Sequence, residues 1–252
     1  FGSSGSGQTL PVFPSLLQSR PPNGPPVRHV TGLTPSPCGR RQPQHSVPSL
    51  PDGGGPRLRD LYSHIRGITA EGGDYTVRNF VGVIEDISVE RSVVETELFP
   101  RGALEFYTKK NMGWSYSQEE YDKWFMPERG GEQGDYRDGM QEKIANVVAC
   151  LRTEPRSKRA VIPIPFSSEG SKTVDWTNQG QTKCCRELHL YLEDGALKCT
   201  GILRMQNASI FPKNIHFFAT LLDHVGKELK VPVGEYTHWI TNLCHDRSAI
   251  SC

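Results

Sequence analysis

The sequence predicts an α+β fold in which helices pack against a sheet, preceded by a disordered N-terminal tail. Apolar residues recur at helical spacing in well-separated stretches, and two strands follow each other as a hairpin instead of alternating regularly with helices. The first 56 residues have a composition that does not support a buried core. We therefore expect two parts, a tail over residues 1–56 and one folded domain over residues 57–252.

The tail is defined by its composition. Residues 1–56 contain 12 Pro and 9 Gly, and Asp52 is the one acidic residue among them. Such a stretch resists regular structure and is typical of disordered segments. A Pro-rich segment can also dock into aromatic grooves of other proteins, so the role of the tail stays open.

The overall charge excludes some classes of partner. The 252 residues carry a formal net charge of +1, which gives no electrostatic reason to expect DNA or a membrane as a partner. The sequence shows no run of about 18 apolar residues and no signal-peptide pattern. The seven cysteines show no repeated C-x-x-C spacing, which argues against a metal site or a disulfide framework. We expect a cytoplasmic protein with free thiols.

The first half of the domain predicts short elements. Apolar residues at helical spacing indicate a helix over 58–66 that ends at Gly67, and a Val- and Ile-rich run indicates a strand or hairpin over 75–89. Over 93–125 the pattern is mixed, because Pro100 and Gly102 interrupt one candidate helix.

A second candidate helix in the same region starts at a capping box, formed by Ser117 with Glu120. Glycines and charges make 128–139 a loop.

The second half of the domain predicts the core. A helix is expected over 140–151, then an edge strand with two prolines over 159–166. Alternating residues predict a hairpin that turns at 193–195. A long apolar helix over 215–229, opened by Pro212, is expected to pack on the sheet.

The candidate nucleophile is Cys184, at the start of the hairpin. Lys183 and Arg186 flank it, and cationic neighbours favour the thiolate, which is the reactive form of cysteine. A buried, inert cysteine is the alternative. Three more cations bracket Cys184 in the sequence and could seat a phosphate, while Asn214 could bind a base edge through its amide. These cations are Lys158, Arg159 and Arg204.

The order of these pieces resembles thymidylate synthase and the related pyrimidine nucleotide hydroxymethylases. The family has S-R-R before a strand, then P-C-H, a D-G turn, an arginine and P-F-N-I opening a long helix. The matching stretches here are Ser157-Lys158-Arg159, Cys184-Cys185, Asp194-Gly195, Arg204 to Asn207 and Pro212-Lys213-Asn214-Ile215. The resemblance covers about a hundred residues, and it implies a thymidylate-synthase-like mixed sheet packed against helices.

The resemblance implies the chemistry of the site. Cys184 would attack C6 of a pyrimidine nucleoside monophosphate, and C5 would then accept a one-carbon unit from 5,10-methylenetetrahydrofolate. Lys158 and Arg159 would reach the phosphate in a partner subunit, which implies a homodimer. Arg204 would bind the phosphate of its own subunit, and Asn214 would recognise the base.

Four further residues are matched to the family more loosely. Arg78 stands for an early phosphate-binding arginine, and Glu97 stands for a catalytic glutamate on a helix, with Glu105 as its rival. Asn207 occupies the position of an aspartate near the folate. His245 is the best match to the H-x-Y that holds the sugar.

Two hypotheses remain open at this point. In the first, the protein is a C5 methyltransferase or hydroxymethyltransferase. In the second, it is a catalytically inactive protein of the same fold that binds nucleotide or serves in assembly. The sequence does not decide between uracil and cytosine, between ribose and deoxyribose, or between a methyl and a hydroxymethyl product.

Overall fold

The computed structural model describes residues 58–70, 76–164, 177–178 and 181–245. The tail expected over residues 1–56 lies outside the described residues. The helices are α1 (Leu58–Ala70), α2 (Arg101–Met112), α3 (Gln118–Trp124), α4 (Met140–Thr153) and α5 (Phe211–Leu229). The strands are β1 (Thr76–Ile84), β2 (Val161–Pro163), β3 (Cys185–Glu193), β4 (Ala196–Leu203), β5 (Gln206–Asn207) and β6 (Val233–Cys244).

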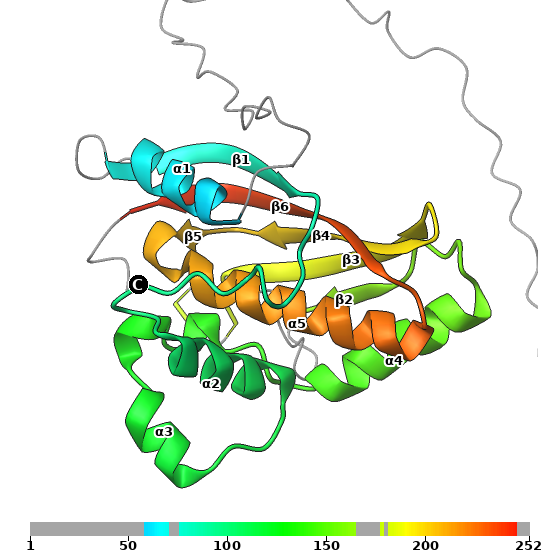
Figure 1. Ribbon diagram of the computed structural model, residues 1–252, viewed down its shortest axis with the longest axis horizontal. Coiled ribbons are helices and arrows are strands. Elements are labelled where there is room, and N and C mark those ends of the chain that lie inside the picture. The colour runs from blue at the N-terminus through cyan, green and yellow to red at the C-terminus, as the bar shows by residue number, and fades with distance from the viewer. Residues whose placement is uncertain (1–57, 71–75, 165–176, 179–180, 246–252) are drawn as a thin grey trace, which may run out of the picture. The chain divides into compact units, whose positions relative to one another are not determined.

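The strands form one mixed sheet (Figure 1). Its order is β1-β6-β4-β3-β2, with the short β5 also paired to β6. The β4–β6 and β5–β6 pairs are parallel and the other pairs are antiparallel. The α+β class expected from the sequence is therefore confirmed.

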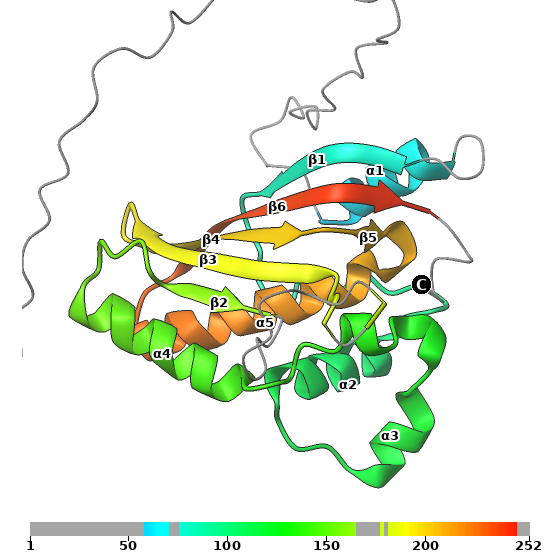
Figure 2. The same ribbon diagram turned by 180° about the vertical axis from the view of Figure 1, so that it is seen from behind.

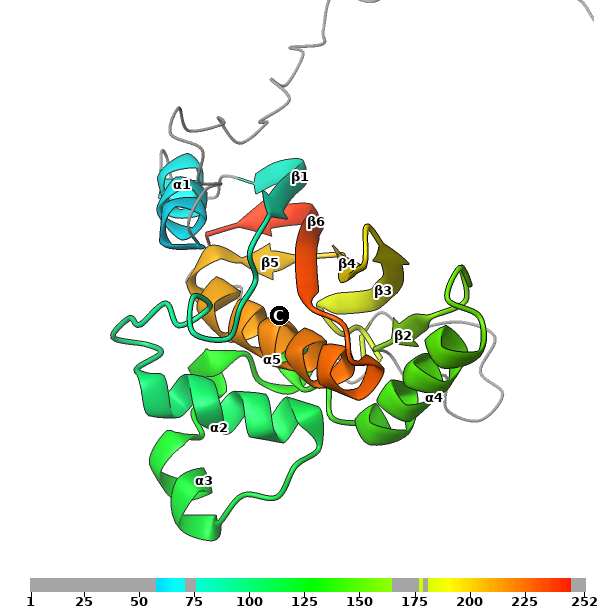
Figure 3. The same ribbon diagram turned by 45° about the vertical axis from the view of Figure 1, so that its right-hand side comes forward.

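One face of the sheet is the apolar core. Residues in register across the strands, such as Phe80, Ile240 and Leu203, point to this inner face and are buried. Helix α5 lies against it, with the Phe218 ring 5.6 Å from the Tyr236 ring. Figure 3 shows α5 between the sheet and α2. The long apolar helix thus forms the centre of the core, as expected.

Helices α1 and α4 pack on the same inner face. The Leu61 side chain of α1 meets Gly82 of β1, and α4 contributes Ile144, Val147 and Leu151 to the core. Figure 2, seen from behind, shows α4 beside β2 and α5. None of the described helices is both long and apolar enough to span a membrane.

Several element predictions are confirmed. Ser117 and Glu120 form the capping box that opens α3, and α4 and α5 begin near the expected residues. β2 lies at the sheet edge, where its one proline, Pro163, is tolerated, while Pro165 lies outside the described residues. The hairpin of β3 and β4 turns at Asp194 and Gly195, which both have positive φ.

Other element predictions are wrong. Helix α1 continues through Gly67 to Ala70 because packing of its apolar face outweighs the weak helix propensity of one glycine. Of the two alternatives for 75–89, the strand is confirmed and the hairpin is not, because β1 is a single strand that pairs with β6. Pro100 does not interrupt a helix but precedes the first turn of α2, where its missing N–H costs nothing.

Candidate active site

Cys184 lies directly before β3, at the end of the sheet where β4 stops. Its backbone N–H donates to the Gln133 carbonyl over 3.1 Å, and its carbonyl accepts from the Arg204 N–H over 3.0 Å. Its side chain is partly buried, and Sγ lies 3.5 Å from Gln133 Oε1. The thiol is therefore held in place by two separate segments and is not enclosed by the apolar core.

Arg204 closes the site from the β4 side. Its Nη2 donates to Gln133 Oε1 over 2.9 Å, so Gln133 bridges the arginine and the thiol. Nε donates to the carbonyls of Thr182 and Lys183, over 2.9 and 3.2 Å. Two of the three guanidinium nitrogens thus fix the segment that carries Cys184. Nη1 donates to none of the described residues and is the nitrogen left for a ligand.

Cations and burial act on Cys184 in opposite directions. Burial raises the pKa of the Cys184 thiol, while the charges of Arg204, Lys213 and Lys183 lower it. The neighbouring Cys185 is fully buried in the core, and burial raises the pKa of its thiol well above the ordinary value. Both cysteines are free thiols. Of the adjacent pair, Cys184 is the partly exposed residue and Cys185 the buried one.

Lys213 belongs to the site, although the sequence reasoning assigned it no role. It lies in the first turn of α5, is 1% exposed, and donates from Nζ to the Gly134 carbonyl over 3.2 Å. Burial lowers the pKa of Lys213 to about 8. The signal was visible in the sequence, because a lysine within the apolar start of a core helix is rarely left unpaired.

Asn214 follows Lys213 and is 1% exposed. A chain of amides sets its orientation: Gln206 Nε2 donates to the Asn207 carbonyl over 2.8 Å, so Gln206 Oε1 must face Asn214 Nδ2, 2.8 Å away. Asn214 Oδ1 is then an acceptor without a partner at ordinary hydrogen-bond distance among the described residues, and the Asn214 amide also interacts with the Tyr136 phenol and lowers the pKa of that phenol. The amide therefore presents an acceptor at this end of the core.

Lys158 and Arg159 do not reach the Cys184 of their own chain. Both are exposed in the link between α4 and β2. Leu190, whose N–H donates to the Ala160 carbonyl, is six residues along β3 from Cys184, a separation of about 20 Å.

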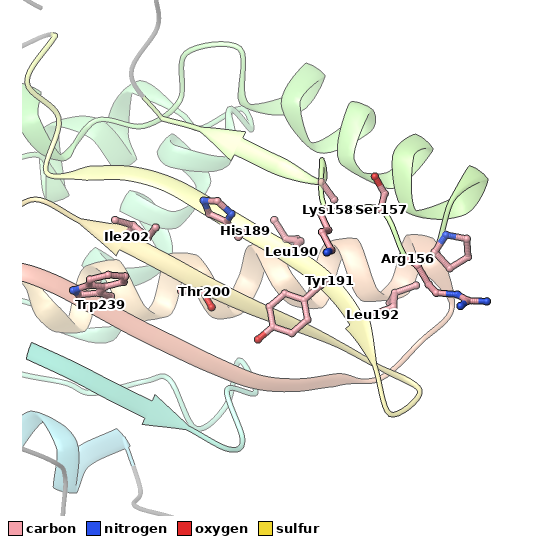
Figure 4. A pocket seen from close by; sticks show the side chains of 12 residues that line it. Arg156, Ser157, Lys158, His189, Leu190, Tyr191, Leu192, Thr200, Ile202 and Trp239 are labelled. Carbon is pink, nitrogen blue, oxygen red and sulfur yellow. The ribbon is translucent and has the colours of Figure 1, made fainter. Parts of the chain in front are cut away.

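Lys158 lines a hollow on the outer face of the sheet (Figure 4). This hollow has a volume of about 510 Å³, and His189, Tyr191 and Trp239 also line it.

Two predicted residues lie near the Arg204 end of the sheet. Arg78 is exposed on β1, in register with Asn242, whose Nδ2 donates to the Arg204 carbonyl over 2.7 Å. His245 directly follows β6, and its Nδ1 is 3.1 Å from Arg66 Nη1 of α1. Asp246 and Arg247, which complete the expected motif, lie outside the described residues.

The structure gives Glu97 and Asn207 surroundings that differ from the expectation. Glu97 is exposed in the loop between β1 and α2, so the helix expected to carry it does not exist. Its rival Glu105 is exposed on α2. Asn207 is 7% exposed, and its Oδ1 accepts from the Ser209 N–H over 2.9 Å, as an N-terminal cap of the short turn before α5.

The fold and the site together define an α+β protein with a partly buried thiol among cations at one end of a mixed sheet. Comparison with known proteins gives a distant relative. No protein-family model matches the chain. The thymidylate synthases of Listeria monocytogenes serotype 4a (strain HCC23) and Listeria innocua serovar 6a are each 27% identical to it over 100 residues.

The thymidylate synthase of L. monocytogenes serotype 4b (strain CLIP80459) is 28% identical over 100 residues. Each match covers 38% of this chain and 29% of the relative, so the matched stretch spans less than a third of the curated relatives. The similarity supports a distant thymidylate-synthase-like relationship and, at most, a transferase-type enzyme.

Proposed function

We propose that the protein is a transferase that adds a one-carbon unit, methyl or hydroxymethyl, to C5 of a pyrimidine nucleoside monophosphate. The observation that carries this proposal is the position of Cys184, partly buried, fixed by Gln133, and surrounded by cations at the sheet end. The distant similarity to thymidylate synthases supports the same class of reaction.

The proposed reaction starts with addition of the Cys184 thiolate to C6 of the base. The S–C6 bond forms, and the electron pair of the C5–C6 double bond moves to C5, with the charge shared by the C4 carbonyl or imine. C5 then attacks the electrophilic one-carbon unit, whose bond to its donor breaks with the electron pair leaving on the donor, and C5 loses its proton. A hydroxymethyl product requires a formaldehyde-level unit and water, and a methyl product requires a methyl-level donor or a hydride donor. Elimination of the thiolate restores the double bond. The nearby cations stabilise the thiolate and the negative charge that develops on the base.

Two side chains would orient the nucleotide. Arg204 has Nη1 left to donate to a phosphate oxygen. Asn214 Oδ1 is an acceptor and would pair with an N–H group of the base edge, N3–H of uracil or the amino group of cytosine. Both candidate bases offer such a donor, so this contact fixes orientation and not identity.

The described residues do not make a site that fits methylenetetrahydrofolate. Asn207, the one residue assigned to it, is buried and uses its Oδ1 as a helix cap. We derive no step through the folate, and the chemical form of the one-carbon donor stays open.

The outer sheet face supports the proposed homodimer. The described helices that pack on the sheet cover its inner face, while Val81, Val83 and Trp239 are 41%, 38% and 44% exposed on the other face. Large apolar side chains in register on one face are typical of an interface. Pairing of two such faces would bring Lys158 and Arg159 of one subunit toward the other and would give them a ligand to bind.

A covalent adduct tests the proposal. We expect 5-fluoro derivatives of uridine, deoxyuridine and cytidine monophosphates to add covalently to the protein. The intact mass should increase by one nucleotide, or by the nucleotide plus the folate where added methylenetetrahydrofolate also reacts. Peptide mapping should place the adduct on Cys184, and Cys184→Ser should abolish it. Cys150→Ser is the matched control, because Cys150 is a free thiol on α4 that is also partly exposed. An unchanged mass with all three nucleotides, both with and without methylenetetrahydrofolate, would contradict covalent addition by Cys184.

The alternative is a protein that binds the nucleotide without reacting. It is favoured by the burial that raises the pKa of Cys184 and by the exposed position of Glu97. In that case calorimetry should detect nucleotide binding that Arg204→Ala weakens, while the intact mass of the protein stays unchanged.

A further inference from the structure

Lys213 occupies a cradle that is shaped for its ammonium group. Two glycines line it, because a β-carbon at Gly130 or Gly134 would collide with Nζ. The Gly134 carbonyl accepts from Nζ over 3.2 Å, and the Tyr107 ring centroid lies 5.2 Å from Nζ. A carbonyl and a ring face both favour a positive charge. The cradle therefore holds a cation, but it supplies no full negative charge.

The one carboxylate nearby is already shared by other cations. Asp135 Oδ2 lies 2.6 Å from Lys110 Nζ and 3.4 Å from Arg137 Nε. Lys183 donates to the Glu132 carbonyl over 2.6 Å. A buried ammonium without a counter-charge costs several kcal/mol. Among the described groups, Asp135 acts on Lys213 as a shared carboxylate, and a further anion would favour the charged form of the lysine.

Cys184 is the group that can become this anion. The Gln133 side chain contacts Cys184 Sγ, and the carbonyl of the next residue, Gly134, accepts from Lys213 Nζ. The charges of Cys184 and Lys213 act on each other. The loop thus places the thiol and the ammonium in one cluster.

The titratable and charged groups that face this cluster come from each element packed against it. They are Tyr107 and Lys110 from α2, Asp135, Tyr136 and Arg137 from the loop, Lys183 just before β3, Cys185 at its start, and Arg204 directly after β4.

We propose that Lys213 is the electrostatic partner of Cys184 and that the reactive form of the site is a thiolate–ammonium pair. In forming it, the S–H bond of Cys184 breaks, the electron pair stays on sulfur, and the proton leaves to water. Lys213 is a positioning residue, since it acts on the nucleophile and not on the substrate. The family motif P-F-N-I has an aromatic residue at this position, so the pair is a property of this chain. The proposal deepens the proposed function, on which its catalytic meaning rests.

The test is the pH dependence of alkylation of Cys184 by iodoacetamide, followed by peptide mass spectrometry. Removing the ammonium in Lys213→Met should raise the midpoint of the curve by about one unit, which slows alkylation roughly tenfold at neutral pH. Lys183→Met is the matched control, because Lys183 is only partly buried and its charge acts less strongly on Cys184. It should shift the midpoint less. An unchanged midpoint in folded Lys213→Met overturns the proposal.

If Lys213→Met does not fold, Cys184→Ala tests the same pairing from the other side. In protein labelled with ¹³C-lysine, the Lys213 Cε resonance reports its protonation. Cys184→Ala removes the anion, so the titration midpoint of Lys213 should fall. An unchanged midpoint there contradicts the pairing. Neither measurement needs turnover. If the thiolate–ammonium pair is found but the protein forms no nucleotide adduct, the proposed function is contradicted and the pairing of Lys213 with Cys184 is still supported.

Discussion

Two buried histidines make the stability of the protein sensitive to pH. His216 on α5 lies with Nδ1 2.6 Å from Thr108 Oγ1, and burial lowers its pKa to about 4. His238 on β6 lies with Nδ1 2.8 Å from the Tyr236 hydroxyl, and burial lowers its pKa to about 3. Both rings are therefore neutral in the folded protein at neutral pH.

The sign of the effect follows from proton binding. Below the ordinary histidine pKa of 6.5, the unfolded chain takes up protons that the folded protein does not. The free energy of unfolding therefore decreases as the pH is lowered. The loss should develop between about pH 6.5 and pH 4 and reach roughly 3 kcal/mol per histidine. Urea unfolding at several pH values measures it.

A substitution isolates the contribution of one ring. His216→Gln should flatten the decline of stability over this pH range, whereas His189→Gln, at a half-exposed residue on the outer sheet face, should leave it unchanged. A decline as steep in His216→Gln as in the unmodified protein would show that His216 is not its source.

At the scale of elements, close contact between β4 and β6 depends on Gly201. A β-carbon there would collide with the Tyr236 hydroxyl and lie 3.2 Å from Leu188 Cδ2. Gly201→Ala should therefore lower the free energy of unfolding by about 1–3 kcal/mol. Thr200→Ala, on the outer face of the same strand, should change it by less than about 0.5 kcal/mol. Equal effects in urea titrations would refute this view of the inner face.

The element that sequence reasoning missed is β6. Its buried inner row contains Tyr236, His238 and Ile240, and the histidine breaks the apolar alternation that identifies a strand. The histidine is accommodated in this row because its Nδ1 lies 2.8 Å from the Tyr236 hydroxyl of the same strand, a side-chain contact that an apolar alternation does not predict. The hairpin of β3 and β4, by contrast, was predictable because its turn and alternation are both local.

The candidate site shows the same division. The nucleophile and Arg204 could be predicted from residue type and order, since both flank the hairpin. Gln133 and the glycines of the Lys213 cradle could not, because they lie about 50 residues upstream of Cys184 in a loop without a periodic pattern and meet the site only through the fold.

At the scale of the molecule, the exposed sheet face carries the prediction of a homodimer. Trp239 lies in register with Val81 of β1 and Ile202 of β4 at the centre of this face. Trp239→Glu should weaken dimerisation at least tenfold in sedimentation experiments. Association would bury the carboxylate of the substituted side chain in the interface without an opposite charge. Trp114→Glu is the control, since Trp114 is also exposed (37%) but lies between α2 and α3. An unmodified protein that sediments as a monomer at every concentration would rule the interface out.

The most direct measurement of the central claim is exchange of the base hydrogen at C5 with solvent. If Cys184 adds reversibly to C6, the charge at C5 is quenched by a deuteron in D₂O. C5 then loses its original proton, and the electron pair of that C–H bond reforms the double bond as the thiolate leaves. The C5–H signal of the true substrate, uridine, deoxyuridine or cytidine monophosphate, should disappear from its proton NMR spectrum with active protein and persist with Cys184→Ser. Persistence of that signal for all three nucleotides with the unmodified protein would contradict the account.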